Sequence, residues 1–358
     1  MTVPPVDQQH TSRDGVPFGE FAEDTVDGEW RPDILGDGFE YTTLHFEDDD
    51  EGPVSATLVR FRPDSGGGTV STTTQGRVRA VLYLHGWSDY FYHRRLAEYW
   101  HEQGVHFFAL DLRRFGRSLR KWTTPGFITD LTEYDEDLTT AIGRIHDDLK
   151  ALLGDEADVE LVGMAHSTGG LVMSLFAARH PETFAALILN SPWLEFYGST
   201  PLRNTVGSLL TPLARRNPRQ LVKLPEVDHY WRSLSREADG EWDLHPVWRP
   251  RLAFPIRAGW LLAILNGHAQ VSKGLNIQTP ILALYSERSK LGLSFVPEMM
   301  AADSVLDVDV NLKRVLSLGS NVTVVRIADG MHDLLSSSSD VREGAYAAIT
   351  RWSQGYLR

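Results

Sequence analysis

A strand, a tight turn and a helix at residues 159–170 constrain this chain more than any other feature. The segment reads VELVGMAHSTGG, in which a short apolar strand ends at Ser167 among small residues. A helix is predicted next, over residues 171–179, and His180 and Pro181 end it. The hydroxyl of a serine on such a turn points out of the sheet, with the helix N-terminus beneath it. The pattern therefore indicates an α/β sheet that presents Ser167 as a nucleophile.

Three further segments each join a buried strand to polar residues. They are residues 80–87 (AVLYLHGW), 105–118 (VHFFALDLRRFGRS) and 322–333 (VTVVRIADGMHD). Together with the Ser167 turn they resemble the α/β-hydrolase superfamily, and within it the monoglyceride-lipase-like branch, also called serine aminopeptidase S33. That branch carries strand-His-Gly, Asp-x-Arg-Gly-x-Gly-x-Ser, His-Ser-x-Gly-Gly and strand-Gly-x-His in this order. The resemblance covers residues 35–358, and Arg114 departs from it by standing where the second motif usually has Gly.

The order of the apolar segments predicts the fold class. Strand-like runs alternate with helix-like runs up to residue 192, and the alternation resumes at residue 279. Such alternation predicts an α/β fold with a mostly parallel sheet, right-handed crossovers and helices on both faces. We expect the α/β-hydrolase fold, with a core formed by residues 35–192 and 277–358. A helical cap or lid is expected at residues 193–276, which contain no clear strand.

The N-terminal region has a different pattern. Residues 1–34 are polar and acidic, and we expect them to form an arm. Residues 39–46 and 54–61 alternate apolar with polar side chains, which predicts a β-hairpin. The acidic run between them, residues 47–53, is expected to be a solvated turn rather than a Ca²⁺ site. Residues 64–76 are rich in Gly, Ser and Thr and are expected to be a mobile loop.

Charge and composition exclude several classes of partner and cofactor. The formal net charge of −13 argues against nucleic acid and anionic membrane surfaces as partners. Because the chain has no cysteine, disulfides and Cys-ligated metals are excluded. No His-Glu-x-x-His motif or phosphate-binding loop occurs, so we expect no metal and no other cofactor. The chain has no secretory signal and no apolar run of about 18 residues, which predicts a cytoplasmic protein without a membrane segment. The sequence does not predict an oligomeric state.

Cleavage through an acyl-enzyme needs a nucleophile, a base, a group that orients the base, and donors for the oxyanion. Ser167 fits the nucleophile. His332 is the candidate base, because it follows the last predicted strand and the order of hydrolase residues is Ser, acid, His. The neighbouring His166 is a poorer base, since residues beside the nucleophile on this turn point away from it.

Three carboxylates are candidates for the group that orients His332. Asp303 lies in the run ADSVLD, which is similar to the Ala-Asp-Arg-Val-x-Asp string that carries the acid in related lipases, and it precedes His332 by 29 residues. Glu287 follows the strand at residues 280–285 directly, but it lies 45 residues before His332. Asp307 is expected at the N-terminus of a helix over residues 308–317. We predict Asp303 as the acid, with Glu287 and Asp307 as alternatives.

The resemblance also implies an oxyanion hole and a pocket. Its donors are expected to be the backbone N–H groups of Trp87, after His-Gly, and Thr168, after the nucleophile. The residues around these donors are expected to border the substrate pocket, and they are His85, Gly86, Ser88, Tyr90, His166 and Trp193.

These features predict a serine carboxylic-ester hydrolase. Its expected substrate is a small-molecule ester with an apolar acyl group, of the monoacylglycerol or lysophospholipid kind. An aminopeptidase-like amide hydrolase or a lactonase with the same triad is the alternative. An aminopeptidase would need acidic cap residues to hold an α-amine, for which Glu195, Glu226 and Asp228 are candidates. A hydrolase fold that binds a ligand without catalysis is a further alternative.

Overall fold

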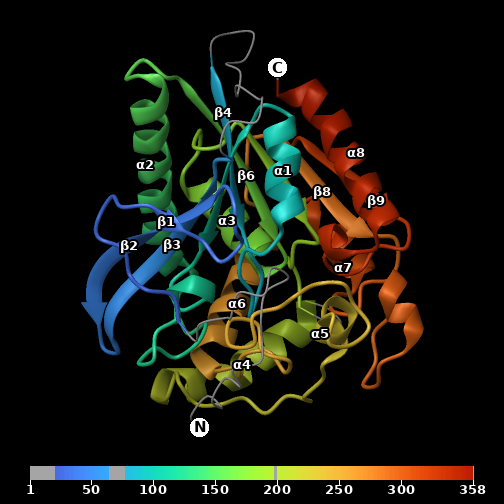
Figure 1. Ribbon diagram of the computed structural model, residues 1–358. Coiled ribbons are helices and arrows are strands. Elements are labelled where there is room, and N and C mark those ends of the chain that lie inside the picture. Colours follow the sequence, from blue (N-terminus) through green and yellow to red (C-terminus); the bar gives the residue numbers. More distant parts are fainter. Residues whose placement is uncertain (1–20, 64–76, 197–199, 358) are drawn as a thin grey trace.

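The computed structural model describes residues 21–63, 77–196 and 200–357 (Figure 1). The first twenty residues of the expected arm and the expected loop at residues 64–76 lie outside the described residues. Nine strands in the described part form a single sheet, in the order β1-β2-β3-β5-β4-β6-β7-β8-β9. The strands are β1 Arg31–Pro32, β2 Phe39–Asp49, β3 Gly52–Phe61, β4 Val78–Leu84, β5 His106–Asp111, β6 Val159–His166, β7 Ala186–Asn190, β8 Ile281–Ser286 and β9 Val322–Ile327.

The sheet is mostly parallel, as the alternation of elements predicts. Strands β4 to β9 are parallel to one another, whereas β1, β2 and β3 pair antiparallel at one edge, where β3 also pairs antiparallel with β5. The α-helices of the described part are α1 Arg94–Glu102, α2 Tyr134–Leu153, α3 Thr168–Arg179, α4 Thr200–Arg216, α5 His229–Leu234, α6 Ala258–Val271, α7 Val308–Val315 and α8 Ser339–Tyr356. Short 3₁₀ helices lie at Gly116–Ser118, Leu131–Glu133, Pro297–Ala301 and Leu334–Ser336.

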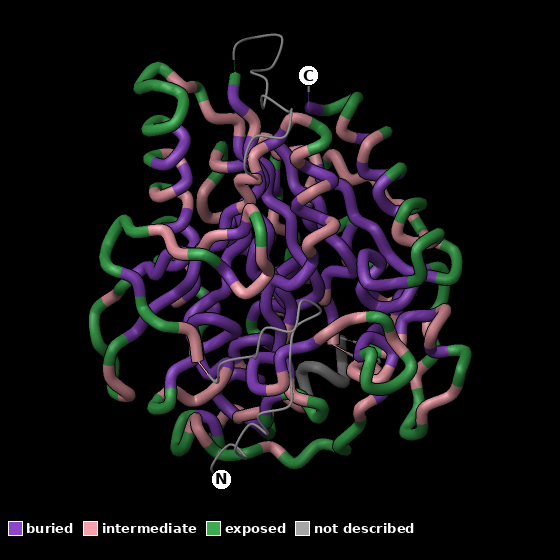
Figure 2. Tube along the Cα trace, viewed as in Figure 1, coloured by how far each residue is buried: buried purple, intermediate pink, exposed green. Residues whose placement is uncertain are grey.

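Each face of the sheet carries its own apolar core. In β4, Leu82 and Leu84 pack with residues of α2 and α3, whereas Val81 and Tyr83 point to the opposite face. That opposite face is covered by α1 and α8 (Figure 1). Successive side chains of a strand point to opposite faces, so a strand that is apolar throughout requires helices on both. Figure 2 shows the sheet as the most continuously buried part of the molecule.

The N-terminal segment is more closely joined to the core than an arm would be. Strand β1 pairs with β2 at the sheet edge. Asp33, which is 7% exposed, forms a buried ion pair with Arg117. The expected hairpin is present as β2 and β3, but its acidic turn is not simply solvated. The Glu51 side chain is only 11% exposed because it lies between two arginines, Arg114 and Arg219.

The region between β7 and β8 is helical in its described part. Helices α4, α5 and α6 gather at the end of the sheet toward which the parallel strands point (Figure 1). The expected cap coincides with this region. None of the described helices is long and apolar enough to cross a lipid bilayer.

Candidate active site

Ser167 lies in the sharp turn between β6 and α3. Its φ of 52° and ψ of −118° fall in a region that residues other than Gly rarely adopt. Backbone hydrogen bonds maintain this conformation: the Ser167 N–H donates to Asn190 O at 3.1 Å, and the Trp193 N–H donates to Ser167 O at 3.0 Å. The strained turn raises the Ser167 hydroxyl above the end of the sheet.

The small residues around Ser167 are required by close packing. A Cβ on Gly169 would lie 2.2 Å from His85 O, and a Cβ on Gly170 would lie 2.6 Å from the Pro192 ring. A Cβ on Gly86 would lie 3.2 Å from Ser167 Cβ, so the segment after β4 passes directly beside the serine. The sequence pattern of small residues therefore follows from the approach of three backbone segments at one point.

Ser167, His332 and Asp303 form a continuous hydrogen-bonded chain. His332 Nε2 lies 2.9 Å from Ser167 Oγ, and His332 Nδ1 lies 2.9 Å from Asp303 Oδ2. A carboxylate can only accept, so Nδ1 carries the hydrogen and Nε2 is free to accept from the serine hydroxyl. The exposed fractions of the three residues are 7%, 1% and 0%, in that order. Such a chain can transfer a proton away from Ser167 as its oxygen attacks.

Asp303 reaches this chain by backbone pairing with the segment that follows β8. The Asp303 N–H donates to Arg288 O, and the Lys290 N–H donates to Asp303 O. The second carboxylate oxygen, Oδ1, accepts from the N–H groups of Val305 and Leu306 at 2.8 and 2.7 Å. With both oxygens engaged, the carboxylate is fixed in its orientation toward the imidazole.

The two alternative acids lie elsewhere. Glu287 is exposed, and its backbone N–H donates to Ile327 O. Asp307 caps helix α7, because its side chain accepts from the Val310 N–H at 3.1 Å. The expected position of Asp307 at a helix N-terminus is thus confirmed, and neither alternative contacts His332.

Two backbone N–H groups flank the serine at the predicted oxyanion positions. Thr168 is the first residue of α3, so its N–H has no partner within the helix. Trp87 follows Gly86, which packs against Ser167. Within the described residues, neither the Trp87 N–H nor the Thr168 N–H donates a hydrogen bond to the protein backbone. Both are therefore available to an oxygen beside Ser167.

His85 and Asp89 fix the loop that carries Trp87. His85 Nε2 accepts from the Leu112 N–H, and its Nδ1 donates to Gly86 O at 2.7 Å. Asp89 accepts from the Gly86 N–H and forms a buried ion pair with Arg249, from the expected cap. Both nitrogens of His85 are hydrogen-bonded to backbone groups, one in this loop and one just after β5, so this residue supports the site from behind.

A cavity of about 250 Å³ lies next to this loop. One of the predicted pocket residues, Ser88, lines it, together with Trp87, the predicted oxyanion donor. The rest of its lining comes from the expected cap and from the segment before α7, and comprises Val227, His229, Tyr230, Trp231, Arg249, Pro250, Arg251, Ala253, Gly292, Ser304 and Val305. The Trp87 indole stacks on Trp260 of α6, with ring centres 3.7 Å apart.

The other predicted pocket residues have different surroundings. Tyr90 lines a separate groove of about 820 Å³ between α1, α8 and residues 236–243. The half-buried Trp193 packs against His268. Neither residue lines the smaller cavity, which therefore draws on only part of the predicted set.

His166 and Tyr230 form a contact that the sequence did not predict. His166 Nδ1 lies 3.1 Å from Asn190 O, which can only accept, so Nδ1 carries the hydrogen. His166 Nε2 is then the acceptor for the Tyr230 hydroxyl, at 3.2 Å. The Tyr230 ring also stands edge-on to His332, with ring centres 5.1 Å apart. Tyr230 comes from helix α5, so only the tertiary fold brings it to the site.

Asp333 is a second residue beside the site that sequence reasoning did not single out, although it is adjacent to His332. Its Oδ1 accepts from Asn190 Nδ2 at 2.6 Å, and its Oδ2 lies 3.0 Å from His93 Nε2. Burial raises the pKa of Asp333, but the His166 and His93 rings and the hydrogen bonds from His93 and Ser336 outweigh it and hold the pKa well below its usual value. A buried carboxylate in this position ties the His332 loop to the end of β7.

No group of three or more His, Cys, Asp or Glu side chains with metal-binding geometry occurs in the described part of the chain. The site as built consists of a hydroxyl, an imidazole, a carboxylate and backbone N–H groups.

Comparison with known proteins identifies the family of the chain. The family described as "Serine aminopeptidase, S33" matches residues 76–336. The chain belongs to this family. The family and the fold class predicted from the sequence, an α/β-hydrolase, are thereby confirmed.

Named relatives of the chain are lipases. A monoacylglycerol lipase of Mycolicibacterium smegmatis is 24% identical over 237 residues, which are 65% of this chain and 78% of that protein. Lipase LipV of Mycobacterium tuberculosis is 28% identical over 190 residues, 51% of this chain and 62% of that protein. A soluble variant of the monoglyceride lipase of Saccharomyces cerevisiae has the same fold, with a TM-score of 0.58 and 16% identity; 87% of this chain and 94% of that chain are covered. The relatives and the family support the predicted enzyme class, a carboxylic-ester hydrolase.

Proposed function

We propose that this chain is a serine hydrolase that cleaves carboxylic esters with an apolar acyl group through an acyl-enzyme on Ser167. The observation that carries the proposal is the buried chain of hydrogen bonds from Ser167 Oγ through His332 to Asp303. Two backbone N–H groups without backbone partners beside the serine, on Trp87 and Thr168, complete the set of groups that acyl transfer requires.

In the proposed mechanism, Ser167 Oγ attacks the ester carbonyl while His332 Nε2 takes its proton. The Asp303 carboxylate stabilises the imidazolium that forms and keeps its ring oriented. The negative charge on the carbonyl oxygen is stabilised by the N–H groups of Trp87 and Thr168. His332 then protonates the leaving alcohol. A water molecule, deprotonated by His332, releases the acid and regenerates Ser167.

The lining of the smaller cavity supports an ester rather than an α-amine as the substrate group. Among the described residues that line it there is no Asp or Glu, whereas Trp87, Tyr230 and Trp231 provide aromatic surface. Of the three carboxylates that could hold an α-amine, Glu226 is exposed and does not line the cavity, and the other two are paired with arginines. Glu195 pairs with Arg314. Asp228, a second candidate, pairs with Arg251. The names of the monoacylglycerol lipase relatives point the same way.

In the same proposal, residues 193–276 act as the cap over a core of residues 35–192 and 277–358. Tyr230 of α5 and Trp260 of α6 support this division, because both side chains reach residues of the core beside Ser167. The cap would then decide which acyl or alcohol groups approach the serine.

Labelling with a fluorophosphonate probe and a panel of acyl esters tests the proposal. We expect one probe adduct per chain, located on Ser167, and turnover that increases with acyl length over short and medium chains. An amino-acid anilide should be cleaved far more slowly. Intact protein that neither reacts with the probe nor hydrolyses any ester of the panel would favour a ligand-binding role instead.

A further inference from the structure

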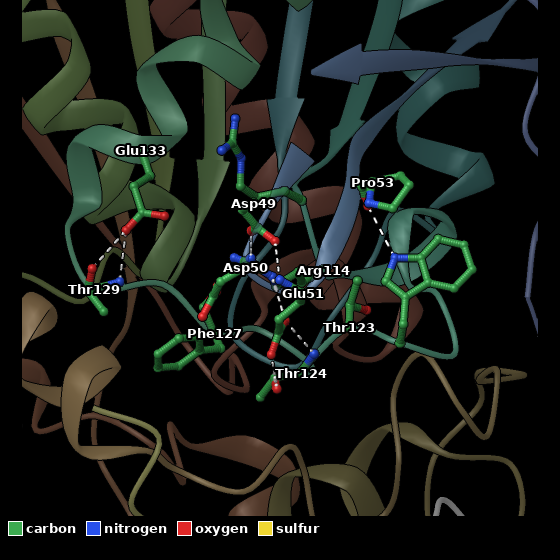
Figure 3. A network of polar contacts seen from close by, with 12 residues as sticks. Asp49, Asp50, Glu51, Pro53, Arg114, Thr123, Thr124, Phe127, Thr129 and Glu133 are labelled. Carbon is green, nitrogen blue, oxygen red and sulfur yellow. Dashed lines mark hydrogen bonds and ion pairs between the residues drawn. The ribbon is translucent and has the colours of Figure 1, made fainter. Parts of the chain in front are cut away.

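The tip of the β2–β3 hairpin holds three consecutive carboxylates whose partners differ. Asp49 pairs with Arg114 of the loop that follows β5. Asp50 pairs with Arg219 through two contacts of 2.8 Å. Glu51 lies between the two arginines, as the centre of the network in Figure 3 shows for its contacts with Arg114 and Thr124. The hairpin therefore joins two segments that are distant in the sequence.

Glu51 is the shared member of this network. Its Oε2 lies 3.2 Å from Arg114 Nε and accepts from the Thr124 N–H at 2.9 Å. Its Oε1 accepts from Arg219 Nε at 3.2 Å and from the Thr124 hydroxyl. Burial raises the pKa of Glu51, but these hydrogen bonds and cations outweigh it and lower the pKa below its usual value. Such a partly buried, fully engaged carboxylate is coupled to its partners more strongly than an exposed ion pair.

On the core side, the contacts of Arg114 lead to Trp87. Arg114 has a φ of 63° and donates through Nη1 to Phe127 O at 2.6 Å. Arg114 O accepts from the Gly126 N–H at 2.8 Å. Gly126 lies close against the Trp87 indole, since a Cβ there would lie 2.7 Å from the ring. The hairpin thus supports one side of the Trp87 indole.

On the other side, the contacts of Arg219 lead to the same indole. Arg219 O accepts from Arg257 Nη1 at 2.7 Å, and the neighbouring Pro218 O accepts from the Gly259 N–H at 2.8 Å. These bonds fix the first turn of α6, which carries Trp260. Trp260 stacks on Trp87 at 3.7 Å between ring centres.

We propose that the hairpin tip, through Glu51, is a positioning element of the substrate pocket: it clamps the Arg219 end of the cap to the loop beneath Trp87. The clamp fixes Trp87 from both sides and so defines the apolar wall that meets the acyl chain. The part of the proposal that concerns the acyl chain rests on the proposed function.

The three adjacent carboxylates provide a matched series of variants. Glu51→Gln removes the charge that bridges cap and core, Asp50→Asn removes a contact to the cap alone, and Asp49→Asn removes a contact to the core alone. Asp48→Asn is the control, because Asp48 is exposed on the same hairpin and its substitution changes the net charge equally.

Hydrogen exchange tests the clamp without relying on activity. In Glu51→Gln, amides of residues 219–222 and 257–261 should exchange about tenfold faster. The effect should be smaller in Asp50→Asn and absent in Asp49→Asn and Asp48→Asn, and helix α2 should be unchanged in all four. Equal exchange of these segments in Glu51→Gln and the wild type would overturn the clamp, whether or not the protein hydrolyses esters.

Kinetics with 4-nitrophenyl acetate and 4-nitrophenyl decanoate test its effect on the pocket. Glu51→Gln should raise KM for the decanoate about threefold to tenfold and leave kcat for the acetate nearly unchanged. Arg219→Gln should do the same, and the double variant should add little to either. A parallel fall in kcat for both esters, or additive effects of the two substitutions, would contradict the positioning role.

Discussion

The loops that follow β6 and β8 bring their residues to the site in different ways. Ser167 comes directly after β6, and its conformation is set by neighbours in the sequence and by the glycines at positions 169 and 170. Asp303 arrives only after residues 287–302 have left the end of β8 and returned. Its position depends on backbone pairing with residues 288 and 290, which the local run ADSVLD does not itself reveal.

The two loops therefore differ in how much of their structure a short run of residues can predict. The turn at Ser167 can be identified from a dozen consecutive residues, because its packing excludes large side chains there. The acid loop, residues 287–307, is instead held in place by backbone pairing between its two sides. Substitution of Ser167 should therefore change the rate of the reaction alone. Substitutions along the acid loop should change either the rate or the stability of the fold.

The largest effect is expected at the turn itself. Ser167→Ala should lower kcat by about 10⁴-fold or more, because the nucleophile is lost. The melting temperature should stay close to that of the wild type, since the hydroxyl is bonded to His332 alone among side chains. A purified variant that keeps more than about a thousandth of the wild-type kcat would show that another residue attacks.

The next effect distinguishes the two carboxylates of the acid loop. Asp303→Asn should lower kcat by about 10²- to 10⁴-fold, because the imidazolium loses its counter-charge. Glu287→Gln should change kcat less than twofold, since Glu287 is exposed and contacts neither Ser167 nor His332. Side-by-side kinetics decide the matter: a collapse of kcat in Glu287→Gln alone would reverse the assignment.

A pH effect on stability is expected at the turn. Burial and the nearby His332 lower the pKa of His166 to about 4, against the opposing Asp333 charge. The unfolded chain binds a proton on this residue below about pH 6.5 and the folded chain does not, so stability is lost as pH falls from 6.5 to 4. The total loss is roughly 3 kcal/mol.

Urea unfolding of His166→Asn over this range measures that contribution. The variant is expected to be less stable at pH 7.5 but to lose less stability on acidification than the wild type. His45→Asn serves as the control, because the His45 side chain is 43% exposed. An identical pH dependence in wild type and His166→Asn would show that the buried imidazole is not the source.

The smallest effect is expected at the end of the acid loop. Asp307→Asn should reduce the free energy of unfolding by about 0.5–1 kcal/mol, because it weakens the charge that caps α7. Its kcat should be unchanged. Asp309→Asn, on an exposed residue of the same helix, is the control for loss of charge alone. A loss of kcat in Asp307→Asn with no loss of stability would mean that Asp307 does more than cap the N-terminus of α7.

The sequence predicted the fold class because the apolar strands and their alternation with helices are local patterns. It predicted Ser167 and His332 as candidates for the same reason: each follows a recognisable strand. It did not predict the contact of Tyr230 with His166, the contacts of Asp333 with Asn190 and His93, or the network at Glu51. Each of these contacts joins side chains from segments that are distant in the sequence and meet only after the chain has folded. The sequence alone therefore predicted a solvated acidic turn at residues 47–53.

Acyl transfer to Ser167 can be tested directly by trapping the acyl-enzyme intermediate. Protein mixed with a slowly deacylated 4-nitrophenyl ester is quenched in acid and analysed by peptide mass spectrometry. We expect a burst of one equivalent of 4-nitrophenol per chain and the mass of one acyl group on the peptide that contains Ser167. Turnover of the ester without any acylated peptide, or with the acyl group on another residue, would contradict it.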